Sequence, residues 1–279
     1  MQMGRNGSLR MGDLTYHNQN SINASDQWWY SHQVNMRSKD TQEIESDFLH
    51  SARFYSVLLR DHLPAHKNCV VLDLPCGEGR MVYVLKTMGY ENVSGYDLDQ
   101  ERVETGRRLG LPVHCGDILA ALREQADNSV DSVFSMDFLE HMEKQDVIHF
   151  LEQAHLKIAP GGKLFVRTPC ADNPLGIQHI YNDFTHKWAA TSGVLEQLLH
   201  SAGFSTIEVF GEEPNLGMRY GFFRVVLFSL SKAAGNLFLR GLGQYPLKIW
   251  TPSMWAVAKK GDKHSAEKGT VFGRVLSEI

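Results

Sequence analysis

The sequence predicts an α/β fold in which a mainly parallel sheet carries helices on both faces. Two observations predict it. Short apolar runs alternate with helical patterns from about residue 68 to residue 210, the order of strand–helix–strand units. The first run, Val70–Leu74, is almost unbroken apolar, as expected of a strand buried on both faces.

Each element follows from its own pattern. The expected strands are Cys69–Leu74, Val93–Asp97, Pro112–Cys115, Ser132–Met136, Lys163–Thr168, Thr206–Phe210 and Ser253–Lys259. The expected helices are Thr41–Asp61, Gly79–Met88, Gln100–Leu109, Ile118–Gln125, Lys144–Ile158, Thr191–Ser201 and Tyr220–Leu242. The stretch Ala159–Gly162, APGG, should end a helix and turn into the next strand.

Composition narrows the class of protein. The 279 residues, 43% hydrophobic, suit one large domain with additions. The net charge is −4, so the chain lacks the excess of basic residues typical of proteins that bind nucleic acid. None of the four cysteines forms a CxxC pair, so we expect buried, reduced thiols in a cytoplasmic protein. We expect residues 1–40 to form a tail and cap segment, 41–260 the domain and 261–279 a C-terminal tail.

A glycine-containing loop, LPCGEGR, follows the first strand. It lacks the lysine of a GxxxxGK[ST] phosphate loop. A dinucleotide fingerprint would need glycine where Val82 stands. The remaining candidate ligand is S-adenosylmethionine. It has no phosphate, and its amino acid end must lie against the turn. Pro75 stands where such a loop usually has glycine, so close approach of the backbone depends on Gly77 and Gly79.

Acidic residues then end three successive strands. Asp73 precedes the loop, Asp97 ends the second strand, and Asp117 follows the third. Ligands bind at this edge of open α/β sheets. A carboxylate at Asp97 can accept hydrogen bonds from ribose hydroxyls, and one at Asp117 from an adenine amino group. Taken alone, Asp117 could equally be a helix N-cap.

The chain resembles class I S-adenosylmethionine-dependent methyltransferases. The resemblance covers about Cys69–Pro169, in the segments VLDLPCGEGR, VSGYDLD, HCGDIL, DSVFSMDFLEH and LKIAPGGKLFVRTP. We expect residues 220–245 to form an inserted lid or interfacial helix between the sixth and seventh strands. The resemblance implies a Rossmann-like sheet of seven strands with the last one antiparallel. It also implies that Asp73, Cys76, Gly77 and Gly79 line the methionine end, Asp97 and Leu98 the ribose, Asp117 and Ile118 the adenine, and Asp137 and Phe138 the sulfonium.

A second block follows the fifth strand, with the pattern H-x-x-x-D-x-T-H-x-W. It is similar to methyltransferases associated with surface polysaccharide and sugar modification. A sugar hydroxyl is a poor nucleophile, so a positioned base helps. We expect His179 or His186 to be that base and Asp183 to orient it. Pinning of the loop by hydrogen bonds is the alternative. We expect no metal, because magnesium prefers oxygen ligands and the block offers one carboxylate.

The function predicted is methyl transfer from S-adenosylmethionine to a hydroxyl of a small molecule, a sugar or glycan precursor. Alternatives are O- or N-methylation of a quinone-like or other aromatic molecule, and a non-catalytic binding protein. The segment Tyr220–Leu242 mixes aromatic, aliphatic and basic residues. It could complete a substrate lid or a homodimer face, or lie at the inner face of the membrane and serve a lipid-linked substrate.

Overall fold

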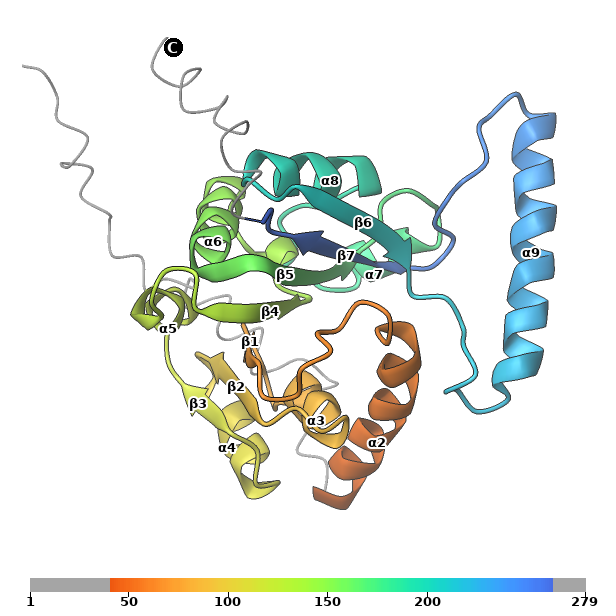
Figure 1. Ribbon diagram of the computed structural model, residues 1–279. Helices are drawn as coiled ribbons and strands as arrows, with labels where there is room; N and C mark the ends of the chain where they lie inside the picture. The colour runs from red at the N-terminus through yellow and green to blue at the C-terminus, as the bar shows by residue number, and fades with distance from the viewer. Residues whose placement is uncertain (1–40, 263–279) are drawn as a thin grey trace, which may run out of the picture. The chain divides into compact units, whose positions relative to one another are not determined.

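The computed structural model describes residues 41–262 and contains a seven-stranded sheet with strand order β3-β2-β1-β4-β5-β7-β6 (Figure 1). All neighbouring strands are parallel except β7, which is antiparallel to β5 and β6. The strands are β1 (Val70–Asp73), β2 (Asn92–Asp97), β3 (Val113–Cys115), β4 (Val130–Met136), β5 (Ile158–Pro169), β6 (Thr206–Gly211) and β7 (Ser253–Lys259). The expected Rossmann-like methyltransferase architecture is confirmed.

Helices cover both faces of this sheet. The described helices are α2 (Thr41–Leu58), α3 (Arg80–Thr87), α4 (Gln100–Arg108), α5 (Ile118–Glu124), α6 (Lys144–Lys157), α7 (Gly176–Tyr181), α8 (Ser192–Ser201) and α9 (Gly221–Gly241). Of these, α9 contributes no side chain to the core clusters of the sheet. Side chains of α5, α6 and α8 share one core cluster with the sheet. Those of α2, α3 and α4 share the other.

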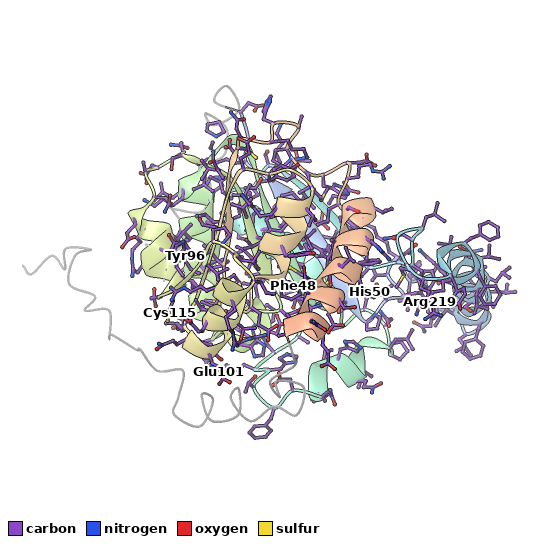
Figure 2. All side chains as sticks on the ribbon, turned by 90° about the horizontal axis from the view of Figure 1, so that it is seen from below. Phe48, His50, Tyr96, Glu101, Cys115 and Arg219 are labelled. Atoms are coloured by element: carbon purple, nitrogen blue, oxygen red, sulfur yellow. The ribbon has the colours of Figure 1, made fainter. Side chains whose placement is uncertain are left out.

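The sheet is buried between these clusters because successive side chains of a strand point to opposite faces. Leu164 packs with α6 and α8, whereas Phe165 packs on the opposite face. There the Phe165 ring stacks on Phe134 with centroids 4.3 Å apart. The ring of Phe48 in α2 (Figure 2) packs against the ring of Tyr83 in α3, with centroids 5.5 Å apart. This contact joins α2 to the same layer.

Three details differ from the expectations. The APGG stretch does not precede its strand: Ile158 already pairs with Val130, and Ala159–Gly162 forms an irregularity inside β5, with Gly161 at φ +82°. The short helix α7 was not predicted, because glycine and polar residues hide its pattern. Cys115 is exposed at the end of the edge strand β3, whereas the other three cysteines are buried as expected.

The chain divides into two units, residues 1–38 and 39–279, and the described residues belong to the second. The expected tail and cap segment at 1–40 lies outside the described residues. So does all but the start of the expected C-terminal tail at 261–279. Both stay predictions.

Candidate cofactor and acceptor site

The glycine loop joins β1 to α3 and takes its shape from backbone bonds. Gly77 and Gly79 have φ of +54° and +86°, a region that favours glycine. The amide of Leu74 donates to the Phe134 carbonyl at 2.8 Å and that of Cys76 to Tyr96 at 2.9 Å. Pro75, joined to Leu74 by a cis peptide, therefore interrupts neither bond. The proline is compatible with the loop.

Asp73 provides a test of whether this loop suits S-adenosylmethionine. Its side chain is buried, and its Oδ1 has no hydrogen-bond partner among residues 41–262. Burial, and secondly the charge of Asp97, raise the pKa of Asp73 well above its usual range. A buried acceptor that lacks a donor is costly unless a ligand supplies one. The ammonium group at the methionine end of the cofactor is such a donor, so the loop fits it.

Asp97 ends β2 with its carboxylate fixed by the backbone. Oδ2 accepts from the Gly77 amide at 2.7 Å, and Oδ1 accepts from the Asp99 amide at 2.9 Å. Each carboxylate oxygen can accept a further bond, so the group keeps acceptor capacity while it holds the loop. Its assignment to the ribose stays a prediction. Leu98, the next residue, is 49% exposed. Cys76 is buried, and its thiol pKa is raised by that burial and then by Asp73 and Asp97.

Asp117 is the N-cap of α5, which was the alternative role considered for this residue. Its Oδ1 accepts from the Ala120 amide at 2.7 Å. Ile118 follows and is buried in the core. The assignment of these two residues to adenine stays a prediction.

Asp137 and Phe138 follow β4. Asp137 is exposed and has a φ of +49°, while Phe138 packs on the core with its ring 5.8 Å from that of Phe150. Both oxygens of Asp137 accept from Nη1 of Arg167 in β5. The residue expected near the sulfonium is therefore held by an arginine that the sequence interpretation did not single out.

That arginine belongs to a set that we term the arginine cluster, formed by Tyr55, Asp137, Arg167, Glu212 and Trp255. Arg167 also donates to both oxygens of Glu212, at 2.9 and 2.8 Å. Glu212 in turn accepts from the Tyr55 hydroxyl at 2.9 Å and from the Trp255 indole at 3.1 Å. Burial alone would lower the pKa of Arg167, but the carboxylates of Asp137 and Glu212 raise it. The cluster ties α2 to β5 and β7 and to the segments that follow β4 and β6.

A second set joins the segment after β4 to β5 and to the segment after α7. We term it the histidine cluster: Glu140, His141, Thr168, Asp183, Thr185 and His186. Glu140, in the short 3₁₀ helix Leu139–His141, is 1% exposed. Its Oε2 accepts from the Thr168 hydroxyl at 3.0 Å, and its Oε1 has no hydrogen-bond partner within residues 41–262. Burial, and secondly Asp137, raise the pKa of Glu140 to about 8, so this carboxyl group retains its proton near neutral pH.

Two imidazole rings complete the histidine cluster, with centroids 4.6 Å apart. His186 Nδ1 lies 2.8 Å from the Ile180 carbonyl, so Nδ1 carries the proton. Nε2 is then the acceptor nitrogen, 3.9 Å from Glu140 Oε1. The Thr185 hydroxyl donates to Asp183 at 2.7 Å and lies 2.8 Å from His141 Nδ1. Since the hydroxyl has one proton, His141 Nδ1 must donate to it. Burial, and then His186, lower the pKa of His141 to about 4.

The structure does not bring all three of the expected catalytic residues, His179, Asp183 and His186, into contact with one another. The structure brings His186 beside His141 and Glu140, and it connects Asp183 to His141 through Thr185. His179 is exposed on α7. Glu140, His141 and His186 each offer one ligand atom, and these atoms lie within 4.8 Å of one another. Among the described residues, this trio could hold a metal, whereas the set His179, Asp183 and His186 is not brought together in this way. Glu140 was missed, although its position in the apolar segment FLEH was a usable signal.

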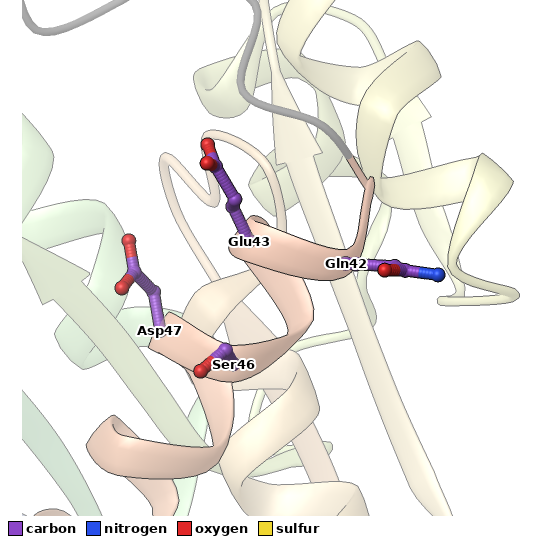
Figure 3. Close-up of a pocket in the computed structure, with 4 residues that line it drawn as sticks. All are labelled: Gln42, Glu43, Ser46 and Asp47. Atoms are coloured by element: carbon purple, nitrogen blue, oxygen red, sulfur yellow. The ribbon is translucent and has the colours of Figure 1, made fainter.

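A separate hollow of about 370 Å³ opens at the start of α2 (Figure 3). Its lining residues are Gln42, Glu43, Ser46 and Asp47. All four come from one helix and none from a strand end. The hollow therefore contains none of the residues that we assign to cofactor or acceptor.

Comparison with known proteins agrees with this geometry. A model described as "Methyltransferase domain" matches residues 48–209, more than half of the chain. The chain belongs to this methyltransferase family, and its methyl donor is S-adenosylmethionine. No curated protein matches the chain significantly.

Solved structures share the fold at low sequence identity. A SAM-dependent methyltransferase from Archaeoglobus fulgidus is 21% identical, with a TM-score of 0.58, over 80% of this chain and 100% of that one. A possible histamine N-methyltransferase from Thermotoga maritima is 18% identical, with a TM-score of 0.51, over 78% and 95%. A Haemonchus contortus phosphoethanolamine N-methyltransferase bound to S-adenosylhomocysteine is 18% identical, with a TM-score of 0.51, over 75% of this chain and 52% of that one.

Proposed function

We propose that this methyltransferase acts on a hydroxyl group of a small molecule, a sugar or glycan precursor, and that His186 is the general base. The observation that carries the proposal is the orientation of His186. The bond from Nδ1 to Ile180 makes Nε2 the proton acceptor. The neighbouring Glu140, whose pKa is raised to about 8, leaves that nitrogen without a competing anion near neutral pH.

The chemistry divides between the cofactor and this chain. Bound S-adenosylmethionine supplies a methyl group on a cationic sulfur. His186 would accept the proton of the attacking hydroxyl at Nε2, and the His141 ring would help to orient His186, since the two centroids lie 4.6 Å apart. Asp183 acts on His141 through the Thr185 hydroxyl as a positioning residue. Proton transfer by a placed histidine contributes about 10²–10⁴-fold to such reactions.

The carbohydrate assignment is supported by the second sequence block and by exposed aromatic rings within it. Tyr181 and Phe184 are 82% and 80% exposed, which suits contact with a sugar ring. An amine is a second candidate acceptor, because two of the similar structures are named as N-methyltransferases. An amine that is already neutral needs little help from a base.

The test measures release of S-adenosylhomocysteine with nucleotide sugars, sugar phosphates, phenols and amines as acceptors. For a sugar acceptor, His186→Ala should lower kcat about 100-fold or more and leave affinity for S-adenosylmethionine within about threefold. His179→Ala is the matched control, an exposed histidine of the same block, and should retain activity. Full activity of His186→Ala on the best acceptor would reject the base and favour a phenol or amine. Failure of the unmodified protein to bind S-adenosylmethionine would favour a non-catalytic role.

A further inference from the structure

Helix α9 has one face that contacts the rest of the domain. Lys232 Nζ bonds Glu213 at 2.5 Å, and Asn236 Oδ1 accepts from the Leu247 amide at 2.9 Å and the Trp250 indole at 3.0 Å. Gly235 lies directly against the Trp250 ring. These contacts fix the rotation of the helix about its own axis, so the side chains on its opposite face point away from the domain.

That opposite face is apolar and exposed. Six apolar side chains on this face are 42–71% exposed. At about 100° of rotation per residue about the helix axis, they fall within an arc of about 120°. We term it the outer face of α9: Phe223, Val226, Leu227, Leu230, Leu237 and Phe238. A contiguous exposed apolar face of this kind indicates an interaction site rather than ordinary surface.

Basic residues border the outer face. By the same rotation, Arg224 and Arg240 lie on opposite edges of the arc, each about 40° beyond its last apolar member. Both are exposed, as is Arg219 just before the helix (Figure 2). The sequence contains no acidic residue between Glu213 and Asp262. The surface around α9 is therefore apolar in the middle and cationic at its edges.

We propose that α9 lies in the surface of a membrane that contains anionic phospholipids, with its outer face among the acyl chains. Arginine stems can lie along apolar surface while their guanidinium groups reach lipid phosphates. Tyr220 and Tyr245, 69% and 91% exposed at the two ends of the segment, are amphipathic side chains that suit the headgroup level. This is the pattern of an interfacial amphipathic helix.

Two other occupants fit less well. The helix has 21 residues and is long and apolar enough to cross a membrane, but its inner face is bonded to the domain at Lys232 and Asn236. A span would bring those groups into hydrocarbon, where they are costly. A second copy of the chain would bring Arg224 and Arg240 towards another cationic edge, and the segment has no acidic residue to compensate.

The test is sedimentation of the full chain with vesicles of phosphatidylcholine alone and with added phosphatidylglycerol. Binding should require phosphatidylglycerol and weaken in high salt. The triple variant Phe223→Ser, Leu230→Ser, Leu237→Ser should bind at least about tenfold more weakly. Arg224→Glu with Arg240→Glu should lose about tenfold or more. The matched control, Arg123→Glu with Lys144→Glu, reverses two exposed charges elsewhere and should bind like the parent.

Each other outcome overturns the proposal in a defined way. Equal binding to neutral vesicles would remove the anionic requirement. Resistance to extraction at alkaline pH would indicate a span. Absence of vesicle binding, with a dimer in sedimentation velocity that the triple variant abolishes, would assign the outer face to a second copy. Titration with S-adenosylmethionine shows that each variant is folded, and it tests the cofactor site separately from the membrane contact.

Discussion

The arginine cluster and the histidine cluster both include residues of the segment that follows β4, yet they differ in how completely their polar groups are paired. Arg167 is matched by two carboxylates, and Glu212 also accepts from a tyrosine and a tryptophan. In the histidine cluster, Glu140 Oε1 has no hydrogen-bond partner among the described residues, and His186 presents an acceptor nitrogen. A saturated network holds a structure, whereas unsatisfied polar groups leave a place for a ligand.

The largest effect should come from breaking the saturated cluster. Arg167→Ala leaves Glu212 largely buried without its counter-ion and releases Asp137. Removing one member of a buried pair costs about 3 kcal/mol or more, and Arg167 and Glu212 are only 17% and 16% exposed. Urea denaturation should show this loss of unfolding free energy. Arg167→Lys, which keeps the charge without the paired geometry, should lose less. A loss below about 1 kcal/mol in Arg167→Ala would mean that the cluster is not structural.

Asp73 extends the comparison, because it shares the unsatisfied state of Glu140. Asp73→Asn keeps the shape but removes the charge that would meet the ammonium of S-adenosylmethionine. A charge-assisted hydrogen bond accounts for about 1.5–3 kcal/mol, so affinity measured by calorimetry should fall about tenfold to hundredfold. The variant should unfold no more easily than the parent, since it removes a buried carboxylate next to Asp97. Unchanged affinity would place the ammonium elsewhere.

Thr185 tests whether the histidine cluster is arranged for catalysis. Thr185→Val deletes the hydroxyl between Asp183 and His141 with little change in shape. We expect kcat to fall about tenfold, about 1.4 kcal/mol, while affinity for S-adenosylmethionine stays constant. Thr185→Ser keeps the hydroxyl and should restore most of the rate. Equal rates in the valine and serine variants would show that the hydroxyl only stabilises the loop.

The sequence predicted the fold well because its signals are local. Apolar runs, glycine turns and strand-ending acids located every strand within a few residues. The assignment of individual residues to parts of the cofactor stays a prediction. The sequence predicted the clusters poorly because they join distant segments: Tyr55, Arg167 and Glu212 meet only in the folded sheet. Arg167 in the buried strand LFVRTP was a visible signal, since an unpaired charge there would be costly. At Asp117 the local pattern fits two roles, because an acid at this position can cap α5 and can also bind a ligand. The structure shows the cap.

Chelation should have the smallest effect and decides between two uses of the histidine cluster. If His186 acts as a base, activity measured with EDTA should equal activity without it. Glu140, His141 and His186 also place three ligand atoms within 4.8 Å, an arrangement that a divalent metal could bind. Activity that EDTA abolishes and added metal restores would therefore reassign the three residues from proton transfer to metal binding. Glu140, His141 and His186 would then hold the metal, which would supply Lewis-acid activation of the acceptor. His179→Ala would remain the control variant in either case.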